Sequence, residues 1–168
     1  MHSSRIDGFL FAESAGVLRG IIPVADFPRL QDMLSSPGGG IAYEVIGIPK
    51  EAGRPALHVS LSGPLKLTCQ RCLGVLEFAL QVDEVLVLAR TEAEIEAQPV
   101  DPESPDRILG GKEMAVGAML EDEILLAVPF APHHQECSEA GEDRIDGSRD
   151  SPFANLRGLL DRGGRTRN

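Results

Sequence analysis

The sequence predicts an α+β fold in which helices pack on an antiparallel β-sheet or a partly closed barrel. Apolar and polar residues alternate with a period of two along most of residues 41–82, which is typical of strands with one buried face. A helical pattern over residues 114–128 and an apolar stripe over residues 152–160 supply the helices. We expect a single domain over residues 1–168, with its core at about 19–160.

The N-terminal part of the chain predicts a short strand and a short helix. Residues 21–24 read as an extended segment. Asp26 is a candidate N-cap for a helix whose apolar positions are Phe27, Leu30 and Leu34. The serine, proline and glycine residues at 35–40 then end this helix.

A β-meander follows, and its central turn contains two cysteines. Alternating segments at residues 41–45, 57–62, 65–68 and 76–82 predict strands, and residues 85–89 are apolar on both faces. The turn between the third and fourth segments is Cys69-Gln70-Arg71-Cys72-Leu73-Gly74. Residues 106–110 suggest one more short strand.

The later part of the chain alternates polar segments with two helices. Residues 91–105 and 138–150 are acidic, and we expect both to be mobile loops. Between them, Pro129 ends the helix predicted at 114–128. Ser151 and Pro152 begin the last helix, whose apolar stripe contains Phe153, Leu156, Leu159 and Leu160. Residues 161–168 form a short basic tail.

The charge argues against direct RNA binding as the main activity. The net charge is −10, and residues 85–168 carry 17 acidic and 9 basic groups. Nucleic-acid binders usually present a basic surface, because the release of phosphate counterions supplies much of their affinity. One Tyr, six Phe and no Trp also provide little for stacking on bases. The composition is that of a globular protein without a membrane span, and we expect a cytoplasmic location.

The cysteines suggest a metal site. Cys69 and Cys72 have the spacing of a zinc knuckle, and His133 and Cys137 could supply the other two ligands. We therefore predict that Cys69, Cys72, Cys137 and one of His133 and His134 converge on a zinc ion. The alternative is that the cysteines are reduced thiols that shape a tight turn, with exposed histidines nearby.

Two further groups are candidate contacts for a partner. Arg71 could bind a phosphate or carboxylate with two parallel hydrogen bonds, although a solvated surface arginine is the simpler interpretation. Glu121, Asp122 and Glu123 predict a solvated acidic face that could meet a basic partner.

Catalytic signatures are missing from the sequence. It contains no Gly-x-Ser-x-Gly, Gly-x-x-x-x-Gly-Lys or His-Glu-x-x-His motif, so we predict a protein that is not an enzyme and has no catalytic residues. A metal-dependent or thiol enzyme that uses Cys69, Cys72 and His133 stays open as an alternative, as does a zinc-containing RNA-binding module.

Three motifs follow one another along the chain. The first is Thr68-Cys69-Gln70-Arg71-Cys72. The second begins at Glu121-Asp122-Glu123 and continues through Pro129 to Pro132-His133 and Cys137. The third is Ser151-Pro152-Phe153-Ala154-Asn155-Leu156. In their order and spacing these motifs resemble the YceD family, and the resemblance covers about residues 19–160.

This resemblance implies a bacterial cytoplasmic factor that supports accumulation of large-subunit (23S) ribosomal RNA, without an established catalytic activity. The partners it implies are a large-subunit ribosomal protein, 23S rRNA or its precursor, or both, and neither a membrane nor a small-molecule substrate. The cysteine pair is the hallmark of the family, and zinc is the cofactor it suggests. The expected metal ligands are Cys69, Cys72, His133 and Cys137. The expected partner contacts are Arg71, Glu121, Asp122, Glu123, Phe153 and Leu156.

Overall fold

The computed structural model describes residues 4–97, 101 and 104–137. The chain divides into two units, residues 1–135 and 136–168, and the helices and strands named below belong to the first. Several predicted features lie outside the described residues: the acidic segment at 138–150, the last helix with Phe153 and Leu156, and the basic tail.

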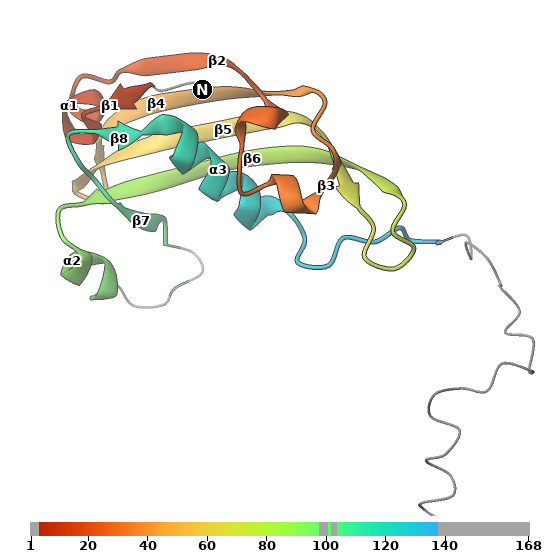
Figure 1. The fold of residues 1–168 in the computed structure, drawn as a ribbon. Coiled ribbons are helices and arrows are strands. Elements are labelled where there is room, and N and C mark those ends of the chain that lie inside the picture. Colours follow the sequence, from red (N-terminus) through yellow and green to blue (C-terminus); the bar gives the residue numbers. More distant parts are fainter. Residues whose placement is uncertain (1–3, 98–100, 102–103, 138–168) are drawn as a thin grey trace, which may run out of the picture. The chain divides into compact units, whose positions relative to one another are not determined.

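Within the described residues, a sheet of six strands forms the centre of the first unit (Figure 1). The strands follow the order β2-β4-β5-β6-β7, and β3 also pairs with β5. Their bounds are Val17–Pro23 for β2, Leu34–Ser36 for β3, Gly40–Glu51 for β4, Arg54–Thr68 for β5, Val75–Ala89 for β6 and Asp106–Leu109 for β7. Neighbouring strands are antiparallel except β6 and β7, which run parallel. The sheet is open, which confirms the α+β fold and decides against a closed barrel.

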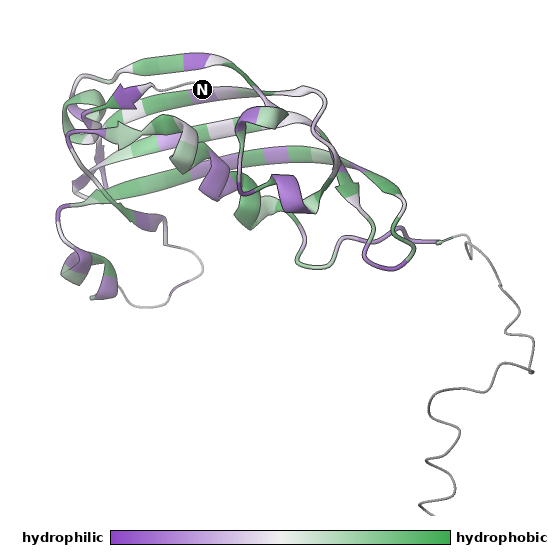
Figure 2. Cartoon of the chain, in the orientation of Figure 1, coloured by the Kyte–Doolittle hydropathy of each residue, from purple (hydrophilic) through white to green (hydrophobic). Residues whose placement is uncertain are grey.

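The period of two in the sequence becomes a buried face in β5 and β6. Leu57, Val59 and Leu61 of β5 are at most 1% exposed, and the residues between them are more exposed. Across the strand pair, Leu57 lies opposite Leu86, and Leu61 lies opposite Val82. Figure 2 shows the corresponding alternation of apolar and polar residues along these strands.

Helix α3 (Val116–Ala127) covers one face of the sheet and confirms the helix predicted at 114–128 (Figure 1). Leu120 and Ile124, one helical turn apart, are fully buried, and Val116 is 2% exposed. This stripe packs in the same hydrophobic core as the buried residues of β5 and β6. Removing a stripe of this kind from water stabilises the fold by about 1.5–3 kcal/mol for each large side chain.

The N-terminal residues pack against the same unit. Helix α1 (Gly8–Glu13) begins at Asp7, whose side chain accepts a hydrogen bond from the backbone of Leu10. Strand β1 (Arg5–Ile6) pairs with β8 (Met114–Ala115), which precedes α3. Among the described helices, none combines the length and the apolar character needed to cross a bilayer.

The prediction of a short helix after Asp26 is wrong. This segment forms two 3₁₀ turns, η1 (Val24–Asp26) and η2 (Gln31–Met33), and then β3. Pro28 has no backbone N–H and disfavours a helical conformation at the preceding residue, and Phe27 is indeed extended.

The segment at 91–105 contains a helix where the sequence predicted a loop. Helix α2 (Glu92–Glu96) follows β6 directly. The carboxylate of Glu94 accepts hydrogen bonds from the backbone of Arg90 and from the side chain of Arg54. These two contacts lower the pKa of Glu94 and hold α2 beside the sheet.

Candidate metal centre

The two cysteines of the first motif lie in the turn between β5 and β6. The backbone N–H of Cys69 donates to the carbonyl of Gly74, and that of Leu73 donates to the carbonyl of Cys69. Leu73 has a φ of 59°, in the left-handed region that non-glycine residues rarely adopt. These features close a tight turn that brings the sulfur atoms of Cys69 and Cys72 to one side.

A loop that follows α3 brings a histidine to this turn. The backbone N–H of Gln70 donates to the carbonyl of Pro132 at 2.8 Å, which joins the loop to the cysteine turn. The Nε2 atom of His134 lies 2.9 Å from the carbonyl oxygen of Val75, and its Nδ1 atom lies 3.4 Å from the Sγ atom of Cys72. A carbonyl oxygen can only accept a hydrogen bond, so Nε2 carries a proton, and in the neutral ring Nδ1 presents a lone pair to the sulfur atoms. Metal-binding histidines are commonly oriented in this way.

Four potential ligands gather at this point. One ligand atom from each of Cys69, Cys72, His134 and Cys137 lies within 4.8 Å of all the others, and the four residues could hold a metal ion. We call them the Cys/His cluster. In a tetrahedral zinc site with Zn–S bonds of about 2.3 Å, ligand atoms stand roughly 3.5–4 Å apart, so a small contraction is enough to close the site.

The structure brings His134 to the cysteines, and not His133. The Nδ1 atom of His133 lies 2.9 Å from the carbonyl oxygen of Ala131, and the residue is exposed. Consecutive residues of an extended loop point in opposite directions, so only one of the two histidines faces the cysteine turn.

The backbone around Cys69 favours its thiolate form. The N–H of Cys72 contributes most, with further contributions from those of His134 and Arg71, and together they lower the pKa of Cys69 to about 5. Burial acts in the opposite direction but does not outweigh these contacts. A thiolate is the form in which cysteine binds zinc.

The predicted acidic face is not solvated. Glu121 and Glu123 are 3% and 8% exposed, whereas Asp122 points to solvent with 55% of its side chain exposed. Arg71 is exposed in the cysteine turn, beside the cluster.

Glu121 instead holds together two distant parts of the chain. Its Oε1 atom accepts hydrogen bonds from the backbone N–H groups of Arg29 at 2.7 Å and Leu30 at 3.3 Å, and its Oε2 atom accepts one from the Arg29 side chain. Arg29 also binds Asp122 at 2.6 Å. Arg29 was not among the predicted site residues, because nothing in its local sequence pattern indicates a partner about ninety residues away.

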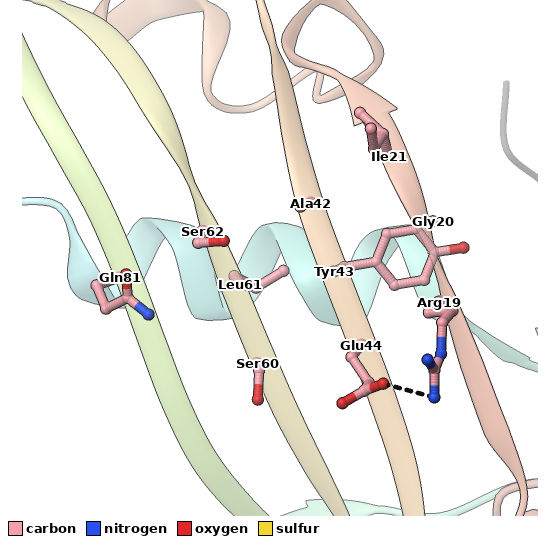
Figure 3. Close-up of a pocket in the computed structure, with 10 residues that line it drawn as sticks. All are labelled: Arg19, Gly20, Ile21, Ala42, Tyr43, Glu44, Ser60, Leu61, Ser62 and Gln81. Carbon is pink, nitrogen blue, oxygen red and sulfur yellow. Dashed lines mark ion pairs between the residues drawn. The ribbon is translucent and has the colours of Figure 1, made fainter.

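A shallow hollow of about 450 Å³ lies on the sheet itself (Figure 3). The small side chains of Ala42, Ser60 and Ser62 lie among larger neighbours, and this difference in size leaves the surface hollow. The ion pair between Arg19 and Glu44 lies at one side.

Comparison with known proteins identifies one family. A family model described as "Large ribosomal RNA subunit accumulation protein YceD" matches residues 57–160. No curated protein matches the chain, and no solved structure does. The matched range contains all four residues of the Cys/His cluster and the whole of α3.

Proposed function

This chain belongs to the YceD family, and we propose that it supports accumulation of 23S ribosomal RNA as a non-catalytic, cytoplasmic factor in assembly of the large ribosomal subunit. The family name links the chain to the accumulation of large-subunit ribosomal RNA. The observation that carries the proposal is that the matched range, residues 57–160, includes the complete Cys/His cluster.

In this proposal the cluster holds a structural zinc ion. Cys69, Cys72, His134 and Cys137 provide three sulfur ligands and one nitrogen ligand, which is a common set for structural zinc. Catalytic zinc sites usually have three protein ligands and leave one position for water or substrate. A fourth protein ligand therefore supports a structural role and argues against the metal-dependent enzyme.

The zinc ion would fix the position of the cysteine turn relative to the loop after α3. That turn presents the exposed side chain of Arg71, and the loop presents Phe130, which is fully exposed. Aromatic residues and arginine are both enriched at protein interfaces. We propose that this end of the first unit contributes to partner binding.

The partner we propose is a basic ribosomal protein of the large subunit, with any RNA contact secondary. The net charge of −10 supports this choice, because an acidic field attracts lysine-rich and arginine-rich surfaces and repels phosphate. The exposed Arg71 beside the cluster favours a second candidate, a zinc-containing RNA-binding module, in which that side chain contacts a phosphate.

Depletion of the protein in a bacterium that carries the gene tests the proposed function. We expect the ratio of 23S to 16S ribosomal RNA to fall, and expression of the wild-type chain to restore it. A Cys69→Ser, Cys72→Ser double variant should fail to restore the ratio, because it removes two ligands of the cluster. An unchanged ratio in the depleted cells would overturn the proposal.

A further inference from the structure

A second feature of the first unit is an acidic pocket on the side of the sheet that α3 covers. The pocket has a volume of about 370 Å³ and lies between β6, β7 and the last turns of α3. Five of the eleven residues that line it are Asp or Glu, and none of the eleven is Lys, Arg or His. We call it the acidic pocket. Its carboxylates include those of Glu84 on β6, Asp106 on β7 and Glu123 on α3.

Glu123 is the unusual member of this group. It lines the pocket yet is only 8% exposed, and among the described residues none forms a hydrogen bond or ion pair with its carboxylate. Burial is the main cause that raises its pKa, followed by repulsion from Asp106, Glu84 and Asp122. No fully buried side-chain oxygen among the described residues lacks a partner, so the carboxylate oxygens of Glu123 are open to the pocket, where a positively charged group from outside can reach them and offset the repulsion between the carboxylates.

The shape of the pocket indicates which positive group this is. Among the described residues, the Cys/His cluster has the ligand spacing of a metal site, and the pocket carboxylates do not. A more extended cation is needed to reach carboxylates on three elements. The planar guanidinium of arginine has five N–H donors and is weakly hydrated.

The walls of the pocket fit the rest of an arginine side chain. Val82, Leu126 and Ala127 contribute apolar surface beside the carboxylates. The three methylene groups of arginine could lie along this surface while its guanidinium reaches the acidic groups.

We propose that the acidic pocket receives an arginine side chain of a basic protein partner. This inference rests on the proposed function, in which the partner is a basic ribosomal protein. It goes further in naming the residue type that binds, the pocket that accepts it and the carboxylate, Glu123, that contributes most.

A peptide titration tests the inference on the full chain. The probe is an eleven-residue Gly/Ser peptide with one central arginine, and its control carries citrulline, which has nearly the same shape without the charge. The readout is the backbone amide shifts of ¹⁵N-labelled protein at a fixed salt concentration of about 150 mM, which limits diffuse attraction. We expect the arginine peptide to shift the amides of Glu84, Asp106 and Glu123, and the citrulline peptide to leave them unchanged.

Two matched variants locate the effect. Glu123→Gln should weaken binding of the arginine peptide at least fivefold. Glu77→Gln, an exposed carboxylate on the same strand β6 but outside the pocket, should change it less than twofold. Glu84→Gln is a second pocket variant, and an undisturbed amide spectrum away from the pocket verifies the fold of each protein.

Three results would overturn the inference. Equal shifts with citrulline would show that charge is not recognised, and equal weakening by Glu77→Gln would show a diffuse acidic surface. Tighter binding of Mg²⁺ alone at the same amides would make the pocket a cation site. Because this assay contains no ribosomal RNA, its failure leaves the depletion result unaffected and the two proposals can be separated.

Discussion

Glu121 shows how one buried carboxylate can stabilise a backbone segment that is not helical. Pro28 disfavours a helical conformation at Phe27, and the N–H groups of Arg29 and Leu30 in the irregular segment that follows need acceptors from elsewhere. Glu121 accepts both, so the backbone groups stay satisfied although the segment is irregular. The contact joins the N-terminal third of the chain to α3.

This role predicts a large difference between two neighbouring acidic residues. Glu121→Ala should destabilise the protein by about 2–3 kcal/mol, because it leaves two backbone donors and a guanidinium without their charged acceptor. Asp122→Ala should cost less than about 1 kcal/mol, since that ion pair is solvent-exposed. Urea unfolding of both variants measures the free energies, and equal losses would contradict the assignment.

Glu123 predicts a dependence of stability on pH. Its pKa is raised in the folded protein by burial and by Asp106, Glu84 and Asp122. The folded state therefore prefers the protonated form, and stability is lost as pH rises from the ordinary glutamate pKa through the raised value.

Glu123→Gln should remove this penalty. We expect the melting temperature of the variant to lie above that of the wild type at pH 7 and close to it at pH 4. Each kcal/mol of recovered stability should raise the melting temperature by roughly 2–4 °C. Thermal unfolding at the two pH values measures this difference. A variant that melts below the wild type at pH 7 would indicate that Glu123 has a stabilising partner.

At the scale of elements, the Cys/His cluster joins the turn between β5 and β6 to the loop after α3. Two adjacent histidines offer a matched pair of variants, because His134 belongs to the cluster and His133 does not. Protein purified under reducing conditions should contain one zinc ion per chain. His134→Ala should lose most of it and melt at least about 5 °C lower, whereas His133→Ala should keep both properties.

Elemental analysis and thermal unfolding measure these outcomes. Equal zinc content in the two histidine variants would contradict the assignment of His134. Wild-type protein without zinc, even after refolding in the presence of the metal, would contradict the structural zinc site.

The sequence predicted those elements that depend on local patterns. A period of two identified the strands, and a period of 3.6 identified α3, because neighbouring residues determine which face is buried. The spacing of Cys69 and Cys72 likewise indicated half of a metal site.

The remaining features depend on residues far apart in the chain. Whether His133 or His134 faces the cysteines depends on the carbonyl oxygen of Val75, which accepts a hydrogen bond from the His134 ring. The two residues are 59 positions apart in the sequence. Glu121 and Glu123 were interpreted as solvated, but the irregular segment after β2 and the carboxylates of β6 and β7 determine their surroundings. The acidic pocket has no signal in the sequence, because three separate elements form it.

At the scale of the whole molecule, charge distinguishes the two kinds of partner. The chain carries 26 acidic and 16 basic residues, which favours a basic protein over RNA. Binding to either partner would weaken with salt, so dependence on salt alone does not separate them.

The central claim is that the protein acts on the large subunit chiefly through a basic protein partner. The most direct measurement is the affinity of the purified, nuclease-treated protein for individual basic large-subunit proteins and, separately, for 23S rRNA fragments at one near-physiological salt concentration. We predict that at least one ribosomal protein binds more tightly than any RNA fragment, and that Glu123→Gln weakens this binding. Tight, sequence-selective binding to an RNA fragment that is lost in Arg71→Ala would contradict the claim and make RNA the direct target.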